Sequence, residues 1–367
     1  MSVDRLITLA IHTYEKAVAL KLKLEREGII AVLNNVNITQ PSLSSGVRVR
    51  IYEKDLPLAL RIVENPDIFD RDSQLLNLKP TIIVPVDFSD YSYRACIMAF
   101  NLAKIHNTTI EVIHSYIHAL PIDKFKYNET LSVSDINENI KAKAKANMSD
   151  FVSKIVEQIK FGIIPPIKFN THIVEGVPED SISQFAKQIH PIIIVMGTRG
   201  AGKKEQELIG SVTGEVLDTC RYPVFAVPES ANIFDVDKLE HVLFFCNNEH
   251  EDIVALDALY RLLPNTHVDI TIINIPNKIT HIVDSFITDE TDLLNYCKDN
   301  FPRFNVSLRS INLDNLKTEF SKIGENAHID LIVVPNKRKN VFSRFFNPSL
   351  AHKILLHADI PMMTIPI

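Results

Sequence analysis

The chain has 367 residues, of which 46% are hydrophobic and 23% charged, which is enough apolar material for two or three domains of ordinary size. The formal net charge of -6 argues against a nucleic-acid-binding protein, and no apolar run reaches the ~20 residues of a membrane span. The N-terminus lacks the pattern of a signal peptide, and the four scattered cysteines predict reduced thiols in the cytoplasm rather than disulfides or a metal site.

The first 70 residues have a pattern of their own. The predicted elements are a strand at 6–10, a helix at 14–27, strands at 29–33 and 47–51 and a helix at 55–63. Gly28 is a plausible C-cap of the first of these helices. The order β-α-β-β-α predicts a small α+β domain over residues 1–70, followed by a polar linker.

A second pattern, of alternating strands and helices, occupies residues 79–229. Strands are predicted at 81–86, 109–113, 168–174, 191–196 and 223–227, with helices at 89–105, about 137–160, 179–188 and 211–219. A polar segment interrupts this pattern at about 116–137. The first strand is apolar throughout, which is typical of a parallel strand buried on both faces. The alternation predicts a doubly wound parallel sheet with helices on both faces.

The same pattern returns over residues 239–367. Strands are predicted at 241–245, 268–273, 305–308, 330–334 and 362–365, with helices at 252–263, 291–300, 316–327 and 349–357. Residues 196–227 overlay residues 334–365 at a constant offset of 138 without a gap, whereas the offset at the first strand is 160. The chain therefore contains an internal duplication, and the second copy lacks most of the polar interruption.

Glycine is scarce, yet five of the 10 glycines lie within the 18 residues that follow the fourth strand of the first copy: Gly197, Gly200, Gly202, Gly210 and Gly214. The carboxyl end of a parallel strand is where α/β sheets bind ligands. Glycines there predict a loop that visits positive φ and lets a phosphate approach backbone N–H groups. Ser211 then begins a helix whose unpaired N–H groups and positive dipole end suit an anion.

These residues resemble those of the universal stress protein family. Gly197-x-x-Gly200, nine further residues and then Gly210-Ser211 match the family's ATP-binding signature, and residues 83–89 at the end of the first strand are also similar. The resemblance covers about residues 80–229 and, more weakly, 239–367. It implies a strand order of 3-2-1-4-5 in each copy, and it implies that the two copies pair as an intramolecular pseudo-dimer, with a homodimer of whole chains also allowed.

The resemblance also implies an adenine-nucleotide site for ATP or AMP, with or without Mg²⁺. Its residues are Pro85, Val86, Asp87, His114 and Ser115 around the adenine, and Met196, Gly197, Gly200, Gly210, Ser211, Val212 and Thr213 around ribose and phosphates. From the residues alone, Asp87 is equally well explained as an N-cap of the next helix. Ser89 is expected to be a cap.

The second copy departs from the signature at each glycine. Pro335, Arg338 and Pro348 stand where the first copy has Gly197, Gly200 and Gly210, and Asn247 replaces Asp87. Proline has no N–H to donate. We therefore expect the second copy to have lost the nucleotide.

Three other kinds of site have weaker support in the sequence. Residues 197–204 resemble a P-loop, but Lys204 stands where a hydroxyl that binds Mg²⁺ is needed. The basic and aromatic stretch at 337–346 is better explained as a solvated loop with apolar anchors than as a nucleic-acid site. The thirteen histidines do not form a convincing metal-binding spacing, and no metal site is expected.

The sequence thus favours a cytoplasmic protein that binds an adenine nucleotide in stress response or signalling. A catalytic pair could not be placed, so the protein is expected not to be an efficient enzyme. Two alternatives stay open: a nucleotide-free scaffold for dimerisation, and a slow ATPase or self-phosphorylating protein. The residues 1–70 resemble a small uncharacterised module associated with signal transduction, without a specific motif.

Overall fold

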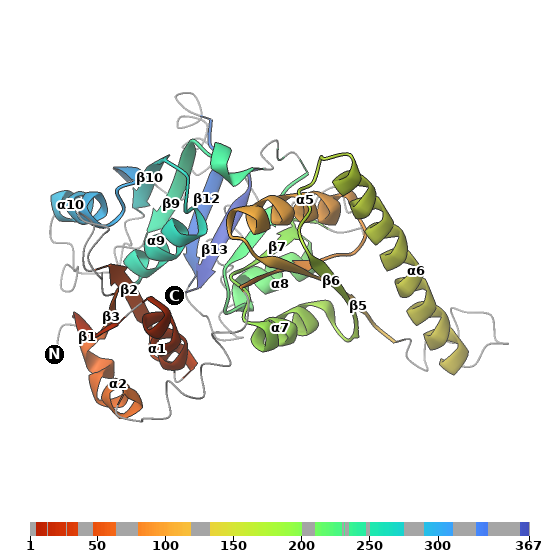
Figure 1. Ribbon diagram of the computed structural model, residues 1–367, viewed down its shortest axis with the longest axis horizontal. Helices are drawn as coiled ribbons and strands as arrows, with labels where there is room; N and C mark the ends of the chain where they lie inside the picture. The colour runs from red at the N-terminus through yellow and green to blue at the C-terminus, as the bar shows by residue number, and fades with distance from the viewer. Residues whose placement is uncertain are drawn as a thin grey trace.

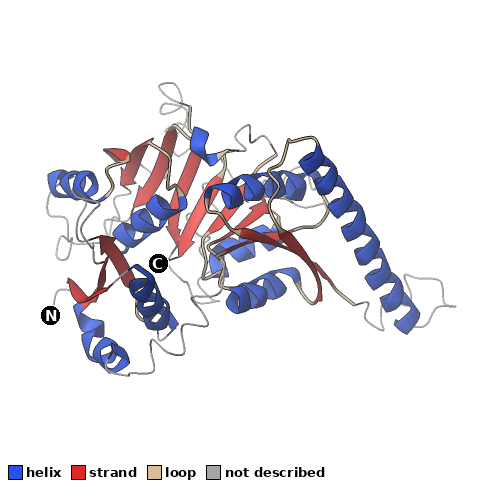
Figure 2. Cartoon of the chain, in the orientation of Figure 1, coloured by secondary structure: helices blue, strands red, loops and turns tan. Residues whose placement is uncertain are grey.

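The computed structural model describes residues 5–12, 14–26, 28–35, 47–63, 80–118, 133–199, 210–229, 231, 235–246, 250–274, 290–310, 328–336 and 360–366. These residues form a three-stranded sheet near the N-terminus and a ten-stranded sheet (Figures 1 and 2). The chain is therefore an α/β protein with a small separate amino-terminal sheet, as the sequence predicts.

The amino-terminal sheet is antiparallel and has the strand order β1-β3-β2. Its elements are β1 (Leu6–His12), α1 (Tyr14–Arg26), β2 (Ala31–Asn35), β3 (Val47–Tyr52) and α2 (Leu56–Val63). The apolar face of α1 packs on the sheet because Ala17, Leu20 and Leu24 recur at helical spacing and are fully buried. Gly28, with φ 83°, follows the end of α1, as expected of a C-cap residue.

The first copy has the expected alternation. Its elements are β4 (Thr81–Pro85), α5 (Asp90–Ile105), β5 (Thr109–Tyr116), α6 (Val133–Lys160), β6 (Phe169–Glu175), α7 (Pro178–Ile189), β7 (Ile193–Gly197), α8 (Ser211–Thr219) and β8 (Val224–Val227). Every residue of β4 and β7 is buried, which explains their uninterrupted apolar sequences.

The second copy repeats this order. Its described elements are β9 (His241–Cys246), α9 (His250–Leu262), β10 (Val268–Asn274), α10 (Glu290–Asn300), β11 (Phe304–Ser310), β12 (Leu331–Asn336) and β13 (Met362–Pro366). The helices predicted at 316–327 and 349–357 lie outside the described residues.

The ten-stranded sheet has the order β11-β10-β9-β12-β13-β8-β7-β4-β5-β6. Numbered within each copy, both halves have the expected order 3-2-1-4-5, and all pairings inside a half are parallel. The halves join through their fifth strands, since β13 pairs antiparallel with β8 and Met363 lies opposite Phe225. The offset of 138 relates these two residues to each other, so the join is centred on equivalent positions.

The two halves also share their apolar cores. One cluster, on the face covered by α5, α6, α9 and α10, contains Phe225 and Met363 together with residues of both halves. The other cluster, on the face of α7 and α8, again includes strand residues of both halves, among them Val224 and Leu243. A side-chain amide adds a link, because Asn336 Nδ2 donates to the carbonyl of Leu217 at 2.6 Å. The halves are therefore expected to unfold together.

On the face of the sheet that α5 and α9 cover, a contact made by His106, the residue after α5, joins the two halves. Its Nε2 lies 3.0 Å from the carbonyl oxygen of Leu262 at the end of α9. Burial lowers the pKa of His106, while the contact with Leu262 and the charge of Asp237 act in the opposite direction. Because the folded chain binds this proton less readily than the unfolded chain, acidification through the ordinary histidine value of about 6.5 favours unfolding.

We expect His106→Gln to reduce this loss of stability between pH 7.5 and 5.5, since the amide can still donate to the Leu262 carbonyl but does not titrate. Urea denaturation at a series of pH values measures the effect, with the exposed His267→Gln as the matched control. Equal pH slopes for His106→Gln and the unsubstituted chain would contradict this assignment.

Candidate functional site

The first copy brings its candidate residues to the carboxyl ends of three neighbouring strands. In the sheet, β4 pairs with β5 on one side and with β7 on the other. The strand order reverses between β4 and β7, and open α/β sheets bind ligands at such a switch point. One group of candidates follows β4 or lies in β5, and the other lies between the end of β7 and the first turn of α8.

The first group is held together by backbone and ring contacts. Val86 donates its N–H to the Ile113 carbonyl at 2.9 Å, and its own carbonyl lies 2.7 Å from His114 Nδ1. Because a carbonyl oxygen only accepts, Nδ1 carries the proton in this contact. Pro85 is the last residue of β4, and Ser115 is half-buried. The prediction that the second strand ends at residue 113 is wrong, since His114 and Ser115 lie inside β5.

Asp87 supports a helix cap rather than forming one. The hydroxyl of Ser89 accepts the N–H of Ser92 at 3.3 Å, so Ser89 is the N-cap of α5, as expected. The same hydroxyl lies 2.6 Å from Asp87 Oδ1, and the Ser89 N–H donates to that oxygen at 3.1 Å. Of the two explanations left open for Asp87, the cap is therefore excluded, and the half-buried carboxylate fixes the turn between β4 and α5.

Phe88 lies in this turn and was not predicted as a site residue. Its φ of 67° is left-handed, a conformation that costs a side chain free energy and occurs often at binding sites. The ring centroid lies 4.3 Å from that of His114 and 5.9 Å from that of Phe151 in α6. Phe88 thus adds an apolar surface beside His114.

The second group is organised by two hydrogen bonds between β7 and α8. The hydroxyl of Thr213, which is buried, donates to the carbonyl of Gly197 at 2.8 Å. The N–H of Gly210 donates to the carbonyl of Thr198, also at 2.8 Å. These bonds hold the amino end of α8 against the end of β7. They also occupy the Gly210 N–H and the Thr213 hydroxyl proton, so those two groups position the helix instead of facing a ligand.

Neither of the two signature glycines that the structure describes has left-handed backbone, and the loop at 200–209, for which positive φ is expected, lies outside the described residues. Gly197 belongs to β7, and Gly210 has φ -72°. The lack of a side chain at Gly197 has another cause, because a Cβ there would lie 2.8 Å from the Cβ of Tyr91 in α5. Gly200 lies outside the described residues.

The first turn of α8 presents donors on this edge. A helix cannot pair its first N–H groups internally, which leaves those of Ser211, Val212 and Thr213. Ser211 is exposed and Val212 half-buried, whereas Met196 in β7 is buried. Backbone donors at a helix amino end, with an exposed hydroxyl beside them, suit a phosphate or another anion.

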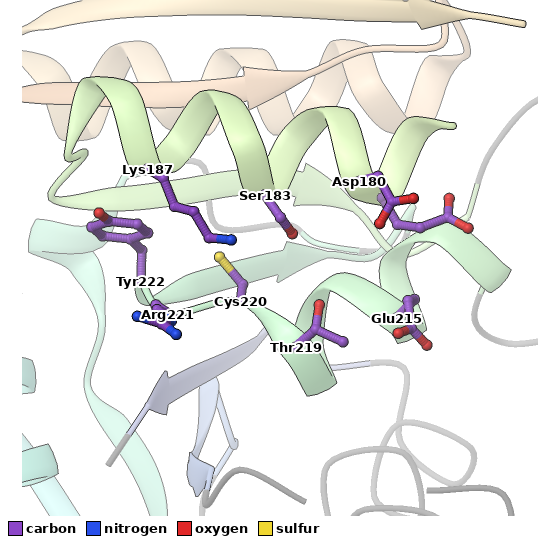
Figure 3. A pocket seen from close by; sticks show the side chains of 9 residues that line it. Asp180, Ser183, Lys187, Glu215, Thr219, Cys220, Arg221 and Tyr222 are labelled. Atoms are coloured by element: carbon purple, nitrogen blue, oxygen red, sulfur yellow. The ribbon is translucent and has the colours of Figure 1, made fainter. Parts of the chain in front are cut away.

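A separate hollow of about 370 Å³ lies between α7 and α8 (Figure 3). Its lining residues are Glu179, Asp180, Ser183, Lys187, Glu215, Thr219, Cys220, Arg221 and Tyr222. Lys187 and the Cys220 thiol lie at one end, and the carboxylates of Asp180 and Glu215 lie at the other. Its three carboxylates outnumber the two cations Lys187 and Arg221, and this negative balance does not favour a phosphate.

Among the described residues, no group of three or more His, Cys, Asp or Glu side chains could hold a metal ion. None of the helices in the described ranges is long and apolar enough to cross a membrane.

The known proteins reported next, to which this chain is similar, are all universal stress proteins. The model of the universal stress protein family matches residues 80–228. The universal stress protein MJ0531 of Methanocaldococcus jannaschii is 32% identical over 155 residues, which is 41% of this chain and 83% of that protein. The crystal structure of a universal stress protein from Archaeoglobus fulgidus covers 78% of this chain and 96% of its own, with a TM-score of 0.56 and 15% identity, and shows the shared fold.

Proposed function

Because the chain belongs to the universal stress protein family, we propose that its first copy binds an adenine nucleotide, ATP or AMP, at the carboxyl ends of β4, β5 and β7. The nucleotide acts as a ligand that changes the conformation or the partner binding of a stress-response protein. The observation that carries this proposal is the amino end of α8, fixed to β7 by the Thr213–Gly197 and Gly210–Thr198 hydrogen bonds.

A fixed helix end binds anions better than a mobile one. The donors of Ser211 and Val212 keep their direction before a ligand arrives, so less ordering is lost on binding. The helix dipole adds a partial positive charge at the same place. On the other side of β4, the His114 and Phe88 rings, whose centroids lie 4.3 Å apart, offer an aromatic surface on which an adenine can stack.

We propose that the second copy binds no nucleotide. Pro335, at the place of Gly197, is buried in β12 and pairs with Ile365 of β13. Asn336, at the place of Thr198, donates to Leu217 of the first copy. In the second copy, Pro335 therefore packs in the core, and Asn336 contacts the other half of the sheet. Arg338, Pro348 and Asn247 lie outside the described residues.

The tandem arrangement follows from the same proposal. We take residues 79–229 and 239–367 to be two family domains and residues 1–70 a third domain. The antiparallel β8–β13 pairing supports an intramolecular pseudo-dimer of the two copies, which leaves a homodimer of whole chains as a further level of assembly. The four cysteines lie in the described part of the chain, where they are buried and form no disulfide, which supports a cytoplasmic location.

We expect the purified chain to bind one adenine nucleotide per chain. Calorimetry with ATP, ADP and AMP, with and without Mg²⁺, measures affinity and stoichiometry, and chromatography of the denatured protein identifies any nucleotide retained from the cell. GTP is the control for base recognition. No heat with any adenine nucleotide would sink the proposal and favour the nucleotide-free scaffold, whereas steady phosphate release from ATP would favour the slow ATPase.

A further inference from the structure

We propose that α9 of the second copy is the docking surface for the chain's own amino-terminal unit (residues 6–63), and that Asp257 and Arg261 specify this contact. The inference goes beyond the proposed function, because it concerns a protein surface and does not depend on a nucleotide. It assigns a role to the copy for which no nucleotide is expected.

The amino-terminal unit has its two helices on one face of its sheet. The larger cluster of buried residues joins α1 and α2 to alternate strand positions, among them Ala31 and Leu33 of β2. Val32, which lies between these two residues, points to the opposite face. There it forms a second buried cluster with Leu6 and Tyr52, and all three side chains are at most 5% exposed. The sheet is therefore covered on the side away from its own helices.

The second copy contributes to this cover. β2 is an edge strand of its sheet, and α9 of the second copy contacts it (Figure 1). An edge strand has backbone groups without a partner strand, and proteins often cover such an edge with a helix. The contact with α9 therefore protects the edge of β2 from pairing with another chain.

One guanidinium connects α9 to β2. The Nη2 atom of Arg261 donates to the Leu33 carbonyl of β2 at 3.3 Å and to the Asp257 carboxylate one turn earlier in α9. This nitrogen carries two N–H groups, so it can make both bonds at once. The Asp257 side chain is 13% exposed, and its i,i+4 ion pair with Arg261 fixes the direction of the longer side chain. The pair therefore holds a donor in place for the edge of β2.

The first copy provides an internal comparison. The offset of 160 relates α9 to α5 without a gap, because it relates both the strands before these helices and the strands after them. At this offset, Asp257 and Arg261 correspond to Ile97 and Asn101, neither of which is charged. The equivalent helix of the first copy thus lacks the ion pair, as expected if docking is a property of the second copy.

Hydrogen exchange of the full chain, measured without nucleotide, tests the docking. We expect Arg261→Leu to speed exchange of the β2 amides about tenfold, because the unit then separates from α9 more often. Arg261→Lys, which keeps a charged donor, should retain most of the protection. Because Arg261→Leu leaves Asp257 unpaired, a double substitution, Asp257→Asn with Arg261→Leu, removes both charges and is expected to give the same increase at β2. Exchange in β12 and β13, which α9 also contacts, should stay unchanged.

The matched control is another i,i+4 ion pair, between Lys21 and Glu25 in α1. Lys21→Leu removes this pair from the unit itself and should change β2 exchange less than about twofold. The inference is overturned if the double substitution leaves β2 exchange unchanged, or if it speeds exchange in β12 and β13 as much as in β2, as a loss of stability in the whole second copy does. A failure of nucleotide binding does not affect this test, so the two proposals can fail separately.

Discussion

Gly197→Ala is expected to abolish nucleotide binding and to lower the free energy of unfolding by about 2 kcal/mol. The new Cβ would lie 2.8 Å from the Cβ of Tyr91, 2.9 Å from its carbonyl carbon and 3.1 Å from its carbonyl oxygen. Two of these atoms belong to the backbone of α5, so no rotation of a side chain relieves the contact. Overpacking of this kind costs about 1–3 kcal/mol.

The expected loss of binding has a geometric cause. To accept the Cβ, β7 and α5 must move apart, which displaces the Gly197 carbonyl that accepts from Thr213 and with it the amino end of α8. Urea denaturation and ATP calorimetry measure the two effects separately.

Gly162→Ala is the control for lost stability alone. Gly162 follows α6 with φ 73° and has open space around its Cβ position, so alanine there strains the backbone by about 1–2 kcal/mol. It should leave ATP affinity unchanged. Full ATP affinity in Gly197→Ala would show that the contact between α5 and β7 does not shape the site.

Phe225→Asp should prevent cooperative folding of both halves of the large sheet. Phe225 and Met363 are 1% and 0% exposed and lie opposite each other where β8 meets β13. An unpaired carboxylate there loses its hydration and the ring leaves a cavity, each a cause of destabilisation by several kcal/mol. Circular dichroism and the yield of soluble protein measure the outcome.

Two further substitutions make the result specific to the join. Phe161→Asp makes the same change at a ring that is 70% exposed and should shift stability by less than about 0.5 kcal/mol. Phe225→Leu should cost about 1 kcal/mol and preserve a single transition. Two separate transitions in Phe225→Leu would indicate that the halves fold independently.

Much of the fold could be predicted because the signals are local. The apolar runs of β4 and β7 and the helical spacing in α1 show which residues of each element are buried, and this pattern lies within the element's own sequence. Element ends were less accurate, and β5 extends to Tyr116 because its later residues pair with β6. The continuous sheet across β8 and β13 could not be predicted from the duplication. The apolar sequences of both strands indicate that they are buried, but they do not indicate which strand pairs with which.

From the residues alone, the candidate site could be predicted only where its members are close in the sequence, and the family resemblance supplied Pro85, Val86, Asp87, His114 and Ser115. The glycines and Ser211 stood out because glycine is scarce elsewhere. At Gly197, which lies in β7, close packing against Tyr91 requires the glycine, and the sequence does not predict this contact.

The antiparallel junction of β8 and β13 also bears on how the sequences of the two copies can diverge. When two identical subunits pair, every mutation occurs twice, and a change that ruins one pocket ruins both. Here a single polypeptide carries both copies, so the second copy can have Pro335 at the position where the first copy has Gly197. On the proposed function, the fusion of two copies in one chain releases the second copy from the need for a ligand, and its sheet edge becomes available for evolution toward a different role.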